Sequence, residues 1–133
     1  MEEVSTIGQL LDFSKNTDTP FLFTIDEVFK GTNTIERISA AKAILEYLNQ
    51  GQHIILVSTH DIELTTLLAA GFDLYYFQES IEEDTLSFDY TLKKGALQKK
   101  NAIRILEIAG YPKEVITEAQ QLSVQFEKEK TGF

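Results

Sequence analysis

The chain has 133 residues, of which 43% are hydrophobic and 25% charged, a composition typical of a folded globular domain and not of a disordered chain. Its formal net charge of -9 argues against a freestanding nucleic-acid binder, because such binding depends on Lys and Arg side chains at phosphates. The chain has no cysteine, no apolar run long enough to span a bilayer and an acidic N-terminus unlike a signal peptide, so we expect a cytoplasmic protein without disulfides or thiolate metal sites.

The first third of the chain predicts a helix, a strand and a second helix. Residues 2–15 carry apolar side chains at helical spacing, and residues 21–25 form a short apolar run that predicts a strand buried on both faces. The next helix is predicted to begin at Thr34 as its N-cap and to end near Gly51, with Ile35 first on its apolar face.

The alternation of helices and strands continues in the middle of the chain. Residues 54–57 predict a second strand that is fully buried, and Asp61 is expected to cap a short helix that Gly71 ends. This order of elements is typical of an α/β protein with a mostly parallel sheet flanked by helices.

The pattern changes after Gly71. Apolar residues alternate with mostly polar ones across residues 72–92, which predicts two antiparallel strands joined by the acidic turn 82–84. A helix over about 97–109, with Ala109 on its inner face, and a last helix opened by Pro112 complete the chain.

The charge is unevenly distributed. Residues 1–89 carry a net charge of -12, whereas residues 90–133 carry +3. Five bases lie in a stretch that contains no acidic residue: Lys93, Lys94, Lys99, Lys100 and Arg104. We interpret this run as a solvated helix face, and the alternative is a patch that binds phosphate.

Two adjacent carboxylates follow the first predicted strand. In an open parallel sheet, ligands bind outside the carboxyl ends of the strands. Asp26 could hold Mg²⁺ there, and Glu27 could orient an attacking water or accept its proton. An apolar strand followed by Asp-Glu is the Walker B form of nucleotide hydrolases, and the alternative is an ordinary acidic loop.

A histidine follows the second predicted strand. His60 ends the sequence Ser58-Thr59-His60 and is therefore expected at the same edge of the sheet as the two carboxylates. There it could contact a γ-phosphate, and the alternative is a surface or capping residue. We predict no role for His53, which lies at the opposite end of its strand.

Taken together and in order, these motifs resemble the C-terminal ATPase domain (domain V) of the MutS family of DNA mismatch repair proteins, a branch of the ABC-type ATPases. The resemblance rests on four segments: residues 21–27, the Gly-Thr-Asn-Thr sequence 31–34, residues 58–65, and the Ala-Gly-Tyr-Pro sequence with the residues after it, 109–116. It covers nearly the whole chain and implies that residues 1–133 form half of a P-loop NTPase domain, with a C-terminal β-hairpin and two helices.

The resemblance also implies roles for individual residues. Glu27 and His60 correspond to the family's catalytic base and γ-phosphate switch, and Asp26 to its Mg²⁺ ligand, with ATP as the nucleotide. The residues expected to reach the nucleotide or the interface of a homodimer in trans are Ser5, Asn33 and Thr34. The alternatives from the residues themselves are a helix N-cap at Ser5 and an ordinary strand-to-helix turn at 31–34.

Two departures from the family pattern limit these expectations. The chain contains no Gly-x-x-x-x-Gly-Lys-Ser/Thr, so we expect a C-terminal fragment that is inactive alone. Lys100-Asn101-Ala102 replaces the family's Ser-Tyr-Gly, which indicates a divergent branch. DNA contacts are expected in domains outside this chain.

Two other classes of function are considered. The first is a non-catalytic remnant that only dimerises or binds a partner. The second is another ABC-type ATPase, whose Leu-Ser-Gly-Gly-type loop does not occur here.

Overall fold

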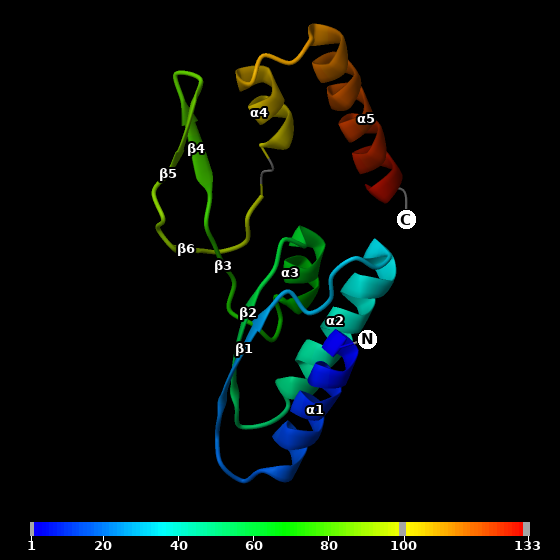
Figure 1. Ribbon diagram of the computed structural model, residues 1–133, viewed down its shortest axis with the longest axis vertical. Coiled ribbons are helices and arrows are strands. Elements are labelled where there is room, and N and C mark those ends of the chain that lie inside the picture. Colours follow the sequence, from blue (N-terminus) through cyan, green and yellow to red (C-terminus); the bar gives the residue numbers. More distant parts are fainter. Residues whose placement is uncertain (1, 99–100, 132–133) are drawn as a thin grey trace. The chain divides into compact units, whose positions relative to one another are not determined.

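The computed structural model of the protein describes residues 2–98 and 101–131 (Figure 1). The elements in chain order are α1 (Glu2–Asn16), β1 (Leu22–Asp26), α2 (Thr34–Leu48), β2 (Ile54–Ser58), α3 (Ile62–Leu68), β3 (Tyr75–Tyr76), β4 (Glu79–Glu82), β5 (Thr85–Phe88), β6 (Lys93–Lys94), α4 (Ala102–Ile108) and α5 (Lys113–Thr131). The chain divides into an N-terminal unit, residues 1–76 with 94–96, and a C-terminal unit, residues 77–93 with 97–133. The predicted mixed α/β class is confirmed.

The N-terminal unit is built on a parallel pair of strands. β1 and β2 pair in register from Leu22 opposite Ile54 to Asp26 opposite Ser58. Because successive side chains of a strand point to opposite faces, Phe23 and the residues that alternate with it on the two strands share one face. Helices α1, α2 and α3 lie on that side of the pair (Figure 1).

The core of this unit lies between the strand pair and its helices. Leu45, Leu48 and Leu64 are the largest side chains that are fully buried. Ile7 of α1 and Ile55 of β2 pack against the core cluster that contains Leu45 and Leu64. Burying a side chain of this size stabilises the fold by about 1.5–3 kcal/mol, so the core is what fixes the ends of β1 and β2 in place.

The prediction that both strands are buried on both faces is wrong. On the second face of the pair, Leu22, Ile54 and Leu56 are 60%, 70% and 63% exposed. The helices of the described residues cover a single face, so the apolar residues of the other face stay largely exposed. Parallel sheets are normally covered on both faces, which makes this surface unusual for a parallel pair.

The start of α2 is shifted by one residue from the prediction. Asn33, not Thr34, is the N-cap: its side-chain oxygen accepts hydrogen bonds from the backbone N–H groups of Ile35 and Glu36, at 3.0 and 3.3 Å. Ile35 is exposed, and the buried face of the helix begins at Ile38. An asparagine amide oxygen reaches these free N–H groups well, which explains the shift.

His53, for which the sequence predicted no role, is a buried structural residue. Its Nδ1 accepts a hydrogen bond from the backbone N–H of Phe21 at 3.0 Å. Since Nδ1 is the acceptor, Nε2 carries the proton and donates to the carbonyl oxygen of Ser14, also at 3.0 Å. The ring also contacts Phe23 edge-on, with centroids 4.9 Å apart. His53 therefore ties α1 to the beginning of β1.

The predicted hairpin exists but is shorter than expected. β4 and β5 pair antiparallel around Glu83 and Asp84, whose φ values of 48° and 58° are those of a tight two-residue hairpin turn. The acidic turn is thus confirmed. The residues before and after this hairpin contribute instead to a separate pair, β3 with β6.

The two C-terminal helices are confirmed, with one boundary corrected. α4 begins at Ala102, five residues after the predicted start, and ends at Ile108. Gly110 follows the C-cap, and its φ of 79° suits glycine. Ala109, expected on the inner face, is exposed at the C-cap. α5 begins directly after Pro112, as predicted.

The basic run is not a helix face. Lys93 and Lys94 lie in β6, and Lys99 and Lys100 lie outside the described residues. Lys93 forms an ion pair with Asp89 at 3.2 Å, and Arg104 of α4 forms ion pairs with two carboxylates. Local carboxylates therefore neutralise two of the five bases. Within the described ranges, no helix is long and apolar enough to cross a membrane.

Candidate functional site at the carboxyl ends of β1 and β2

Glu27 lies just past the end of β1. Its backbone N–H donates to the carbonyl oxygen of Ser58 at 2.9 Å, which continues the β1–β2 pairing by one residue. Its φ of 57° is in the left-handed region, which a non-glycine residue adopts rarely. Such backbone strain is common at functional sites, where the surrounding structure holds it.

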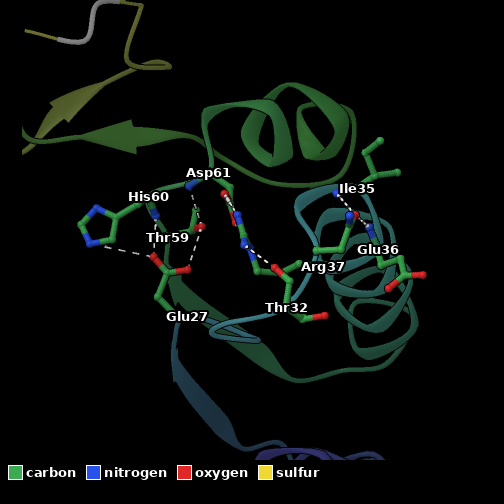
Figure 2. Close-up of polar contacts among 9 residues, drawn as sticks. Glu27, Thr32, Ile35, Glu36, Arg37, Thr59, His60 and Asp61 are labelled. Carbon is green, nitrogen blue, oxygen red and sulfur yellow. Dashed lines mark hydrogen bonds and ion pairs between the residues drawn. The ribbon is translucent and has the colours of Figure 1, made fainter. Parts of the chain in front are cut away.

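The Glu27 carboxylate is held by the segment that follows β2. The backbone N–H of His60 donates to its Oε1 at 2.6 Å, and the Thr59 hydroxyl donates to its Oε2 at 3.3 Å (Figure 2). The Glu27 side chain is 15% exposed, whereas that of His60 is fully exposed, with Nε2 4.0 Å from Oε1. The sequence prediction that Glu27 and His60 meet at one sheet edge is confirmed, and the imidazole is free to contact a ligand.

Asp26 occupies the last position of β1. Its Oδ1 accepts a hydrogen bond from the Ser58 hydroxyl at 2.6 Å, and both residues are exposed. Within residues 2–98 and 101–131, no group of three or more His, Asp or Glu side chains could hold a metal ion. One carboxylate beside a hydroxyl is too few ligands for a permanent metal site, but it suits Mg²⁺ that arrives with a phosphate and keeps several waters.

An ion pair lies directly behind this site. The Arg37 guanidinium of α2 donates from Nε to Oδ2 of Asp61 at 3.0 Å and from Nη2 to Oδ1 at 2.7 Å (Figure 2). Its Nη1 donates to the carbonyl oxygen of Thr32 at 3.2 Å. The hydrogen bond to Asp61, together with the charges of Asp61 and Glu27, raises the pKa of Arg37 above its ordinary value.

The residues predicted to act in trans lie apart from this cluster. Ser5 is exposed on α1, three residues after the helix begins, so the alternative of a helix N-cap is wrong. Thr34 is exposed in the first turn of α2, and the Asn33 side chain caps that helix. In the part of the chain that the structure describes, no hydrogen bond links Ser5, Asn33 or Thr34 to Glu27. Their predicted role at a partner's site stays a prediction.

The sequence predicted no role for Arg37 and the wrong role for the Asp61 side chain. Asp61 is at the N-cap position of α3, as predicted, but its side chain makes no capping hydrogen bond. It pairs instead with a residue 24 positions earlier. The residues that follow neighbouring strands of a parallel sheet lie close together. This rule was the one signal in the sequence for a contact between Arg37 and Asp61.

The structure thus defines a class: a mixed α/β protein with a carboxylate pair and a histidine at the carboxyl ends of parallel strands. The family described as MutS domain V matches residues 1–127. The chain belongs to this family, and the predicted resemblance is confirmed.

Curated relatives agree with this assignment. The chain is 33% identical, over 96% of its length, to the DNA mismatch repair protein MutS of Aquifex pyrophilus. It is 31% identical over 98% of its length to the protein of the same name from Rickettsia rickettsii (strain Sheila Smith), and 34% identical over 84% to that from Orientia tsutsugamushi (strain Boryong). It spans 16%, 15% and 13% of the lengths of these relatives.

Proposed function

We propose that residues 1–133 form the C-terminal part of an ABC-type P-loop ATPase domain in a MutS-like DNA mismatch repair protein that works as a homodimer. One observation carries the proposal: Glu27 and His60 meet at the carboxyl ends of β1 and β2 in a chain of the MutS domain V family. ATP is the proposed substrate, and the repair context follows from the names of the relatives.

Glu27 is the proposed catalytic base. It orients a water toward the γ-phosphate of ATP and accepts a proton from it as the new P–O bond forms and the bond to ADP breaks. The fully exposed His60 imidazole lies beside this carboxylate, where it would contact the γ-phosphate and respond to its loss.

Asp26 is the residue that would hold Mg²⁺, with the Ser58 hydroxyl beside it. An exposed carboxylate with few protein ligands around it fits an ion that shares its coordination with phosphate and water. When bound, the ion would neutralise charge on the β- and γ-phosphates.

The proposed site also includes residues that make no hydrogen bond to Glu27 within the described structure. Ser5, Asn33 and Thr34 would reach the nucleotide or the interface of the second subunit. The uncovered apolar face of β1 and β2 supports a larger domain, because parallel sheets are normally covered on both faces. The chain covers about a sixth of the length of its relatives. We therefore propose that the DNA contacts are made by other parts of the protein.

A non-catalytic role in dimerisation or partner binding is the second candidate. It is favoured by the absence of a Gly-x-x-x-x-Gly-Lys-Ser/Thr sequence in these 133 residues and by exposed apolar residues on α5, such as Val124 and Phe126. A partner surface needs neither Glu27 nor His60, so the two candidates differ in what a Glu27 substitution does.

The test is Glu27→Gln in a full-length protein that contains this chain. We expect ATP to bind as before and its hydrolysis to fall by about 100-fold or more, since removal of a general base typically costs this much. Glu46→Gln, which removes a carboxylate paired with Lys42 on the surface of α2, is the matched control and should hydrolyse ATP normally. A normal hydrolysis rate in Glu27→Gln would contradict the proposal. The isolated chain should show no Mg²⁺-dependent turnover.

A further inference from the structure

Arg37 lies beside the candidate site, and the proposed function assigns it no role. Its guanidinium and the Asp61 carboxylate are only 20% and 15% exposed, and they form two parallel hydrogen bonds. A two-point contact of this kind fixes orientation as well as distance, because the planar guanidinium matches the carboxylate plane. Arg37 therefore holds the Asp61 side chain in one position.

Asp61 in turn is joined to the residues that hold Glu27. Its backbone N–H donates to the Thr59 hydroxyl oxygen at 3.0 Å, and that hydroxyl donates onward to Glu27 at 3.3 Å. The neighbouring His60 N–H makes the shorter bond to the same carboxylate, at 2.6 Å. A shift of Asp61 would move both of these donors, because they belong to the two residues just before it in the chain.

The second anchor of Arg37 is the loop after β1. Nη1 donates to the carbonyl oxygen of Thr32 (Figure 2). Thr32 lies between Gly31, whose φ is 73°, and the helix cap Asn33. The segment 31–34 contains Asn33 and Thr34, two of the three residues proposed to meet the partner subunit. One side chain thus bonds both to that loop and to the segment that holds the proposed base.

We propose that Arg37 is a positioning residue for the Glu27–His60 pair: through Asp61 it fixes the two donors to the Glu27 carboxylate, and through Thr32 it ties them to the loop 31–34. The positioning is a property of this chain's own hydrogen bonds, and its consequence for ATP hydrolysis rests on the proposed function. Lysine cannot replace Arg37 fully, because an ammonium group lacks the planar pair of donors.

Amide hydrogen exchange of the 133-residue chain, followed by NMR at fixed pH, tests the proposal directly. In Arg37→Met, we expect the His60 amide to exchange about tenfold faster, since a lost charged hydrogen bond makes local opening easier. Asp61→Asn should have the same effect, and the double variant should add little to either single change. Arg37→Lys should fall between Arg37→Met and the unsubstituted chain.

Two controls separate positioning from a general loss of stability. Lys42→Met removes a positive charge from the same helix, where Lys42 pairs with Glu46 on the surface, and should leave His60 exchange unchanged. The Leu45 amide, at the centre of the core, should be unaffected by Arg37→Met if Arg37 acts locally. Unchanged His60 exchange in Arg37→Met, or equal acceleration at Leu45, would overturn the proposal.

Hydrolysis by a full-length protein supplies the second readout. Arg37→Lys should lower kcat for ATP by about tenfold and leave KM nearly unchanged, because Arg37 is proposed to orient the base without touching the nucleotide. A change in KM alone would contradict positioning. If exchange responds as expected while Glu27→Gln hydrolyses ATP normally, the proposed function fails and the positioning role of Arg37 stands.

Discussion

Each of the two units of this protein is stabilised by a different kind of interaction. In the N-terminal unit, apolar side chains around Leu45 are removed from water and pack against a parallel strand pair. In the described residues of the C-terminal unit, no side chain is fully buried, and side-chain hydrogen bonds join several of its elements. Arg104, for example, pairs with Asp84 of the hairpin turn and with Glu107 of its own helix.

This difference explains where the candidate site lies. A site needs its groups held to within a fraction of an ångström, and tight packing provides that more reliably than exposed ion pairs do. Glu27 and His60 follow β1 and β2, and the buried core holds these strands in place. The contact between the two residues therefore depends on the burial of the core side chains. Exposed pairs such as Arg104 with Asp84 contribute little stability, because water and salt compete for both partners.

The largest expected effect comes from the core. Leu45→Ala should lower the free energy of unfolding of the N-terminal unit by about 2–5 kcal/mol, since a fully buried leucine leaves a cavity when it is truncated. Leu122→Ala on α5, where the side chain is partly exposed, is the matched control and should cost less than about 1 kcal/mol. Urea unfolding followed by NMR signals of each unit measures both. Equal costs for the two variants would refute the contrast between the units.

The two histidines offer a second test within the N-terminal unit. His53→Phe keeps a ring of similar size but leaves the Phe21 N–H and the Ser14 carbonyl without their partner, at an expected cost of about 1–3 kcal/mol. His60→Phe, at a fully exposed position, should change stability by less than about 0.5 kcal/mol. Thermal unfolding of both variants gives the comparison, and a costly His60→Phe would mean that its ring packs against the protein.

A smaller effect is expected in the C-terminal unit. Arg104→Met removes the ion pairs with Glu107 and Asp84. The hydrogen bond to Glu107, followed by the charges of both carboxylates, raises the pKa of Arg104 above its ordinary value. Because the guanidinium is half-exposed, we expect a loss well below that of Leu45→Ala and further reduced by salt. Urea unfolding at low and high salt measures this loss. A loss as large as that of Leu45→Ala would show that polar contacts provide most of the stability of the C-terminal unit.

The smallest effect is local and depends on pH. The Thr91 N–H, and after it Lys93, lowers the pKa of Asp89 below its ordinary value. A lowered pKa means that the turn is stabilised at pH values above the ordinary value for aspartate and loses this contribution as the pH falls through the lowered value. The Thr91 amide proton shift should therefore change at a lower pH than for an ordinary aspartate, and Asp89→Asn should abolish the change. Asp84→Asn should leave it intact.

The parts that the sequence predicted well depend on local pattern. Helical spacing located α1 and α2, and the acidic turn between alternating residues located the β4–β5 hairpin. The start of α2 was misplaced because Asn33 and Thr34 are both good caps, and the choice depends on which side chain reaches the free N–H groups. Apolar content predicted buried strands, but burial depends on what lies on each face, and one face of β1 and β2 is uncovered.

The sequence alone determined the family motifs, the α/β order and the expectation that Glu27 and His60 lie at one edge of a sheet. These follow from residue order, because the carboxyl ends of parallel neighbouring strands lie together. Only the tertiary structure showed that Arg37 pairs with Asp61, that Thr59 and the His60 amide hold Glu27, and that His53 joins α1 to β1. Such contacts join residues far apart in sequence, and the packing of α2 and the strand pair around the shared core decides which of them meet.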